Sequence, residues 1–302
     1  MAHLTAAGAL LIAATSAAAA DQPPAPAPAP SVHEVVVLGK APTQARERQI
    51  EHFLQRVPMV NNGVALARWT DPVCPIVVGM TREQAEYVIQ RLFQVAKAAG
   101  APVIDNGDCQ VNVFIIATAA PTALVKALGQ RSPGIYANAT ADDVRAFEET
   151  TRPVRAWYKA RLDALTTDAD SPFEGLEGLP RSTRVIHHAD DTRLHSNSPY
   201  AITSAIVVVD SNQAAGVKVG ALADYIAVAS LTQLQQDADG SGAPSILALF
   251  STPAGSPPPD GLTDWDTAYL RALYHTDLED FHQSSTIALH MNKALGGSGG
   301  GR

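Results

Sequence analysis

Two stretches rich in β-branched residues constrain the fold more than any other feature of the sequence. Residues 111–118 read VNVFIIAT and residues 201–210 read AITSAIVVVD. Apolar runs of this length and composition are typical of buried strands. Helical patterns flank both runs without a regular alternation of strand and helix. We therefore predict an α+β fold, with a mixed sheet and packed helices forming one large domain or two small lobes.

The clearest helix is predicted to follow Thr81. Thr81 and Gln84 have the spacing of a capping box, in which each side chain bonds the backbone of the other. Apolar residues then recur at helical spacing. Gly100 ends the helix as the residue after its last turn, and Pro102 prevents its continuation. Similar reasoning predicts a helix over Ala141–Glu149, with acidic residues in its first turn.

A more apolar helix is predicted after Gly220. Its apolar side chains are expected to pack on the strand at 206–209; they are Leu222, Tyr225, Ile226 and Ala229. We expect Asp224, a charged residue on this helix, to be exposed or to act as a cap.

Both ends of the chain have compositions that cannot form a core. Ala6–Ala20 has the apolar character and small-residue ending of a signal peptide cleaved before Asp21, although a simple Ala-rich leader is the alternative. Residues 21–30 read DQPPAPAPAP, which is typical of an extended linker. The prediction is an exported, periplasmic protein without a transmembrane span in its mature chain. The folded part is predicted to consist of an N-terminal α/β lobe (31–130) and a C-terminal α+β lobe (131–295). A flexible tail (296–302) follows.

Composition excludes two broad classes of protein. Hydrophobic residues make up 46% of the chain and charged residues 17%, which excludes a mostly disordered chain. With a formal net charge of −8, the chain lacks the excess of basic residues that is typical of nucleic-acid-binding proteins, so this class is excluded as well.

The two cysteines, Cys74 and Cys109, are predicted to form a disulfide. An exported chain matures where disulfides persist. Cys74 precedes the helix that follows Thr81, and Cys109 precedes the strand to which the chain returns after that helix. The two ends of this strand-joining segment are therefore expected to lie close together. Two free buried thiols, or a metal site completed by two further ligands, are the alternatives.

Residues 154–162 alternate with the two-residue period of a strand. One face is apolar, and the other face carries a tryptophan between cations; its residues are Arg155, Trp157, Lys159 and Arg161. Such a face is a candidate platform for a sugar or an anionic ligand. The alternatives are a solvated face, or a second core layer that covers Trp157.

The densest group of metal-ligand residues follows residue 186. A hairpin there would bring its side chains together for a transition metal; they are His187, His188, Asp190 and His195. An exposed polar hairpin tip is the alternative. The sequence has no H-E-x-x-H, no phosphate-binding glycine loop and no spacing that couples a nucleophile to a base. We therefore predict no catalytic residue and no cofactor.

Four short segments carry a resemblance to known proteins; they read WTDPVCP (69–75), VVVD (207–210), LADY (222–225) and YLRALY (269–274). With these segments the chain resembles a group of exported alphaproteobacterial proteins of unknown function. It is more distantly similar to exported zincin-like proteins, which carry metal-binding histidines on a helix where residues 222–231 have none. Because no catalytic motif is present, we predict a non-catalytic binding or structural role with an envelope component, an anionic ligand or a sugar. The alternative is a degenerate zincin-like hydrolase.

Overall fold

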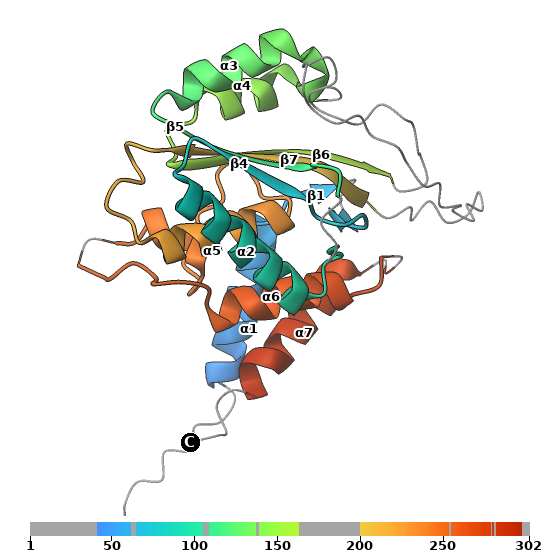
Figure 1. Ribbon diagram of the computed structural model, residues 1–302. Helices are drawn as coiled ribbons and strands as arrows, with labels where there is room; N and C mark the ends of the chain where they lie inside the picture. The colour runs from blue at the N-terminus through green and yellow to red at the C-terminus, as the bar shows by residue number, and fades with distance from the viewer. Residues whose placement is uncertain are drawn as a thin grey trace, which may run out of the picture. The chain divides into compact units, whose positions relative to one another are not determined.

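Most strands of the main sheet are joined to β7 (Tyr200–Asp210) in the computed structural model (Figure 1). β6 (Val154–Leu162) pairs antiparallel with one edge of β7, while β5 (Val113–Thr118) and the short β3 (Arg68–Trp69) pair parallel with its other edge. β4 (Pro75–Val78) pairs parallel with β5. Parallel and antiparallel neighbours in one sheet, together with packed helices, confirm the predicted α+β class.

The structure describes residues 41–61, 65–104, 109–136, 139–162, 200–253, 255–278, 280 and 282–297. All of them belong to the second of the two units into which the chain divides, Lys40–Arg302, and the boundary predicted at residue 130 falls inside this unit. The predicted signal peptide, the linker at 21–30, the histidine cluster at 187–195 and most of the predicted tail lie outside the described residues.

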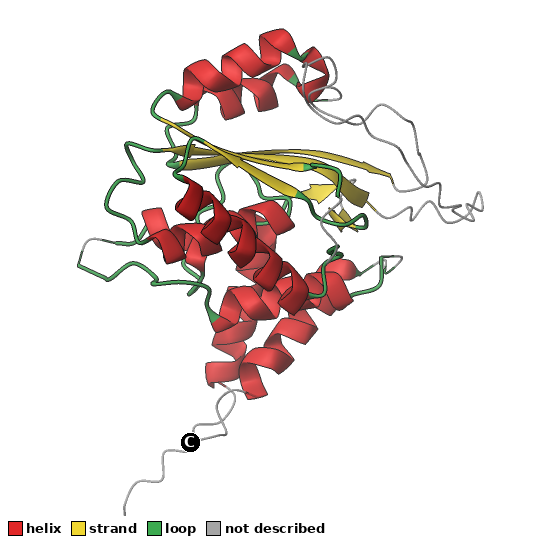
Figure 2. Cartoon of the chain, in the orientation of Figure 1, coloured by secondary structure: helices red, strands yellow, loops and turns green. Residues whose placement is uncertain are grey.

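Helices cover both faces of the sheet (Figure 2). On one face lie α3 (Pro121–Arg131), the 3-10 helix η1 (Pro133–Tyr136) and α4 (Ala141–Glu149). Their apolar side chains form a core with the sheet that includes Phe147 and Trp157. This smaller core is separate from the one on the opposite face, so the sheet is buried on both sides.

The opposite face carries the larger core. α2 (Arg82–Ala99) and α5 (Val219–Leu231) lie against the sheet and pack on each other. The remaining elements are α1 (Ala41–Arg56), β1 (Val60–Asn61), β2 (Ala65–Leu66), η2 (Ile246–Phe250), α6 (Asp264–His275) and α7 (Gln283–Gly297). No helix in the described part of the chain is long and apolar enough to cross a lipid bilayer.

The ends of α2 form as predicted. Thr81 and Gln84 make both hydrogen bonds of the capping box. At the other end, the backbone N–H of Gly100 reaches carbonyl groups of the last turn, with a φ of 87° that favours glycine. α2 connects β4 to β5, so these caps determine where the chain leaves one strand and enters its parallel neighbour.

The two cysteines lie at disulfide distance, as predicted. The sulfur atoms of Cys74 and Cys109 are 2.01 Å apart and their Cα atoms 5.8 Å apart. Cys74 directly precedes β4, and Cys109 lies four residues before β5. The side chain of Asn112 supports this corner, because it accepts the N–H of Cys74 at 2.8 Å and donates to the carbonyl of Pro72 at 2.9 Å.

From residue 223 to its end at residue 231, α5 is buried on every side, which corrects one prediction. Tyr225, Ile226 and Ala229 are core residues as expected, and Leu222 is partly buried. Asp224 is only 4% exposed, so the expectation of an exposed or capping aspartate was wrong. Its carboxylate accepts hydrogen bonds from the side chain of Arg91 on α2 and, at 2.7 Å, from the backbone N–H of residue 262. These donors compensate for the loss of water around the charge.

The buried C-terminal end of α5 needs partners for its last carbonyl groups. Three aromatic side chains supply them: Tyr158 from β6, Trp69 from β3 and Tyr274 from α6. They donate to the carbonyls of residues 229, 230 and 231 at 2.6, 2.8 and 2.7 Å, respectively. Burial raises the pKa of both tyrosines, so their hydroxyl groups stay protonated and remain donors.

Candidate functional site

A cavity of about 250 Å³ lies beside the outer edge of β6, the edge that faces away from β7. This volume is just below the range of about 300–1,000 Å³ that is usual for ligand pockets, so the cavity suits only a small ligand. Its polar lining comes from β1, α4, β6 and the segment after α5, and includes Asn61, Asp143, Lys159, Arg161, Gln233 and Gln236. Three of the four residues of the predicted ligand face, Trp157, Lys159 and Arg161, contribute to this lining.

Trp157 does not form an exposed platform. It is only 8% exposed and packs against Tyr136 and Phe147, with ring centroids 5.0 and 5.1 Å away. Its indole N–H donates to the carbonyl of Ile135 at 2.9 Å. The sequence alternative in which a second core layer covers Trp157 therefore describes this residue, because η1 and α4 pack over it.

Arg155 is also covered and serves as a helix cap. It is 4% exposed, and one guanidinium nitrogen donates to the carbonyls of Phe147 and Glu148 at 3.2 and 3.1 Å. These carbonyls belong to the last turn of α4, where helical partners are missing. Burial lowers the pKa of Arg155, and the nearby charge of Asp210 opposes this shift. Arg155 therefore cannot offer its charge to a ligand at the predicted face.

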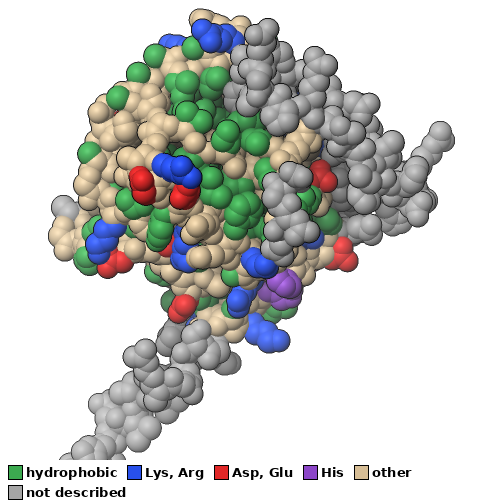
Figure 3. Space-filling view, viewed as in Figure 1, with side chains coloured by type: hydrophobic (Ala, Val, Ile, Leu, Met, Phe, Trp, Pro, Cys, Tyr) green, Lys and Arg blue, Asp and Glu red, His purple; other side chains and the backbone are tan. Residues whose placement is uncertain are grey.

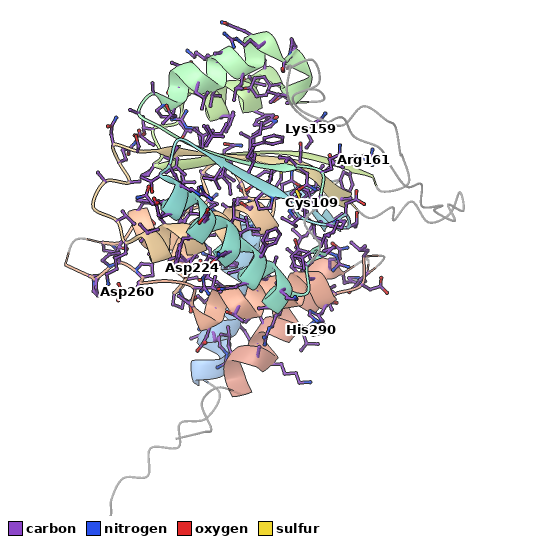
Figure 4. All side chains as sticks on the ribbon, in the orientation of Figure 1. Cys109, Lys159, Arg161, Asp224, Asp260 and His290 are labelled. Carbon is purple, nitrogen blue, oxygen red and sulfur yellow. A yellow bond between two sulfur atoms is a disulfide. The ribbon has the colours of Figure 1, made fainter. Side chains whose placement is uncertain are left out.

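Lys159 and Arg161 lie farther along the same strand and are partly exposed. Figure 4 shows both at the same end of the sheet. A β-bulge between Lys159 and Ala160 leaves Thr203 of β7 without a partner in the register, and the Thr203 hydroxyl donates to the carbonyl of Lys159 at 3.2 Å. Bulges redirect side chains and are frequent beside functional sites. Within the described residues, no ion pair or side-chain hydrogen bond involves the Lys159 ammonium group.

Amide side chains form a further part of the lining, the amide wall, and are held by hydrogen bonds. The Asn61 amide donates to the Gln233 side chain at 2.9 Å, and Gln233 in turn donates to the sulfur of Met59 at 3.0 Å. Gln236 donates to the backbone carbonyl of Ala156 at 3.1 Å. Ordered amides offer a ligand both donors and acceptors at little entropic cost.

The charges in the described lining are unequal. Lys159 and Arg161 contribute two positive charges, and Asp143 contributes one negative charge. Asp143 also caps α4, since one of its oxygens accepts hydrogen bonds from the backbone N–H and the hydroxyl of Thr140 at 3.2 and 2.6 Å. The lining therefore favours a ligand that carries a negative charge, although the whole chain is acidic.

The predicted metal cluster lies outside the described residues; its members are His187, His188, Asp190 and His195. Among the residues that the structure does describe, no group of three or more His, Cys, Asp or Glu side chains could hold a metal ion.

A second surface feature is apolar. Val78, at the exposed end of β4, is 53% exposed, and Tyr87 of α2 is also exposed. Figure 3 shows hydrophobic side chains gathered on this face of the molecule. Exposed apolar side chains are usual on protein surfaces, so the cavity beside β6 is the stronger candidate site.

The sequence analysis did not identify the amide wall. Asn61 and Gln233 are 172 residues apart, and neither belongs to a motif. No family model, no curated protein and no solved structure matches this chain. The resemblance to exported alphaproteobacterial and zincin-like proteins therefore stays a prediction.

Proposed function

We propose that this protein is an exported, non-catalytic binding protein whose ligand is small, negatively charged and bound in the cavity beside β6. The observation that carries this proposal is the pair Lys159 and Arg161 on the wall of a cavity of about 250 Å³. A ligand enclosed there loses part of its hydration shell, and partly buried cations compensate for that loss better than exposed ones.

The amide wall adds selectivity to this charge attraction. Asn61, Gln233 and Gln236 already make hydrogen bonds within the protein, which restricts their rotamers. A ligand with hydroxyl, carbonyl or amide groups can bond to their remaining donors and acceptors. A preorganised wall of this kind is typical of a binding site, because little side-chain entropy is lost when the ligand binds.

Export and a periplasmic location complete the proposal. They are supported by the apolar run Ala6–Ala20, which resembles a signal peptide, and by the disulfide distance between Cys74 and Cys109. An envelope component that carries or releases such an anion is the partner that fits this location.

The alternative from the sequence is a degenerate zincin-like hydrolase. The helix that would correspond to the metal-binding helix is α5, whose residues 223–231 are all buried in the core. A side chain there packs against neighbours and does not line the cavity. Stoichiometric zinc in the purified protein would nevertheless favour the hydrolase over the binding protein.

Calorimetric titration tests the binding role. Glucuronate and citrate are anionic probes, trialanine is a zwitterionic probe that offers one carboxylate, and glucose is the neutral control without a carboxylate. We expect at least one of the three carboxylate-bearing probes to bind more tightly than glucose, and Lys159→Gln to weaken this binding by about ten-fold, the effect of one charge-assisted hydrogen bond. Lys126→Gln, at an exposed lysine of α3, is the matched control and should change nothing. Binding of none of the three carboxylate-bearing probes, or equal binding by Lys159→Gln and Lys126→Gln, would overturn the proposal.

A further inference from the structure

The register of β6 with β7 determines which backbone N–H and C=O groups of β6 point away from β7. The N–H of Ala205 in β7 donates to the carbonyl of Asn112 on the β5 side at 2.9 Å, so the backbone of Ala205 faces away from β6. Its register partner in β6 is Tyr158. Tyr158 therefore belongs to a non-hydrogen-bonded pair, and its N–H and C=O face outward. Backbone direction alternates along a strand, so Ala156 faces outward as well. Ala160 also faces outward, because the extra residue of the bulge, Thr203, belongs to β7 and leaves the alternation along β6 unbroken.

A side chain of the protein occupies the outer edge of β6 at Ala156, and a cavity lies along this edge at Tyr158 and Ala160. At Ala156 the Gln236 side chain bonds the outward carbonyl at 3.1 Å and takes the place of a neighbouring strand. Along Tyr158 and Ala160 lies the cavity. Within the described residues, β6 pairs with β7 alone. The outward N–H and C=O groups of these two residues are therefore the backbone groups that a ligand in the cavity can reach.

We propose that the ligand is a short, extended peptide with a free carboxylate, which adds as a strand to the outer edge of β6; this inference rests on the proposed function. The peptide backbone pairs with the outward groups of Tyr158 and Ala160, in the manner of other peptides that extend an open sheet edge. Lys159 and Arg161 precede and follow Ala160, so their long side chains reach one side of the added strand and hold the carboxylate.

Two observations favour a peptide over a sugar acid or a multiply charged anion. Donors and acceptors repeat along the β6 edge with the two-residue spacing of a strand, about 7 Å, and a peptide backbone has the same repeat. The described lining carries one net positive charge, from Lys159 and Arg161 against Asp143. It therefore matches a single carboxylate better than a dianion, and Asp143 can receive a free amino group.

Three peptides separate backbone pairing from charge attraction in titrations of the unmodified protein. Trialanine carries both features, trialanine amide lacks the carboxylate, and trialanine methylated on its central amide nitrogen lacks one backbone donor. We expect each loss to weaken binding by about ten-fold. In Lys159→Gln the difference between acid and amide should shrink, while the effect of methylation should remain. Lys126→Gln should preserve both differences.

The outcomes distinguish this inference from the proposed function. Binding of glucuronate or citrate that depends on Lys159, without tighter binding of trialanine, would overturn the peptide but keep the anion site. Equal affinity for methylated and unmodified trialanine would overturn strand addition. Binding of none of the probes would remove both proposals.

Discussion

The two ends of β6 carry the same kind of side chain and use it differently. At the start of the strand, Arg155 and Trp157 lie under α4 and η1, and both donate hydrogen bonds to backbone carbonyls. At its end, Lys159 and Arg161 line a cavity and are partly exposed. The same alternation of residues therefore produces a structural half and a candidate binding half.

The difference shows what makes a cation structural. Arg155 is covered by the last turn of α4, whose unpaired carbonyls need a donor. No helix of the described chain ends over Lys159, and its ammonium group can serve a ligand. Whether a second layer of helices packs on a residue of β6 thus decides if its side chain is structural. Substitutions along β6 should therefore lower the free energy of unfolding under α4 and η1, and should leave it unchanged beside the cavity.

The largest effect is expected at the covered end. Trp157→Ala should lower the free energy of unfolding by about 3–5 kcal/mol, because it leaves a cavity between the sheet and the α3–α4 layer. Urea denaturation measures this loss. Leu289→Ala, at an exposed leucine of α7, should cost under about 0.5 kcal/mol and is the control. A loss below about 1 kcal/mol at Trp157 would show that the second layer does not pack on β6 as described.

A smaller loss is expected from the neighbouring cation. Arg155→Met keeps most of the apolar stem but removes the donors to the end of α4, so it should cost about 1–3 kcal/mol in the free energy of unfolding. Arg145→Met on the same helix is the matched control, because Arg145 is exposed and pairs only with Asp142 at 2.6 Å. Equal stabilities of the two variants in the same denaturation experiment would contradict the capping role of Arg155.

The stability of the helical layer over Trp157 should also depend on pH. Burial raises the pKa of Tyr136, which packs on Trp157, from 10.0 to about 12. The unfolded chain then releases its proton before the folded protein does. The stability linked to Tyr136 is therefore complete below pH 10 and decreases as the pH rises toward 12.

Tyr136→Phe isolates this contribution from the other buried tyrosines. Between pH 9 and pH 11 its free energy of unfolding should decrease less than that of the unmodified protein, as measured by urea denaturation at both values. Identical decreases in the two proteins would place the titration elsewhere.

The smallest effect is expected at the open end. Lys159→Gln should change the free energy of unfolding by less than about 0.5 kcal/mol, because no described partner is lost. Thermal and urea denaturation without ligand measure it, with Lys126→Gln alongside. A decrease of more than about 1 kcal/mol in the free energy of unfolding would contradict the difference between the two ends of β6, since Lys159 would then be structural in the way that Arg155 is.

Features with local causes were predictable from the sequence. The capping box of Thr81 and Gln84 and the stop at Gly100 act within one helical turn, so α2 was placed correctly. The strands β5 and β7 followed from runs of β-branched residues. The approach of Cys74 to Cys109 followed from a helix that leads out and a chain that returns.

Features that depend on distant partners were not predictable. Asp224 is buried because Arg91, 133 residues away in the sequence, reaches it from α2. Nothing in the residues around Asp224 identifies that donor. The free energy of a buried charge depends on what replaces water around it, and this is known only once the helices pack.

The candidate site combines both kinds of information. The two-residue period of residues 154–162 predicted that Arg155, Trp157, Lys159 and Arg161 share one face of the strand. Only the tertiary structure divided this face, by packing η1 and α4 over its first half and by bringing Asn61 and Gln233 into the same cavity lining as its second half. A strand's own sequence determines which side a residue faces, whereas the layers packed on that side decide whether the residue meets protein, water or a ligand.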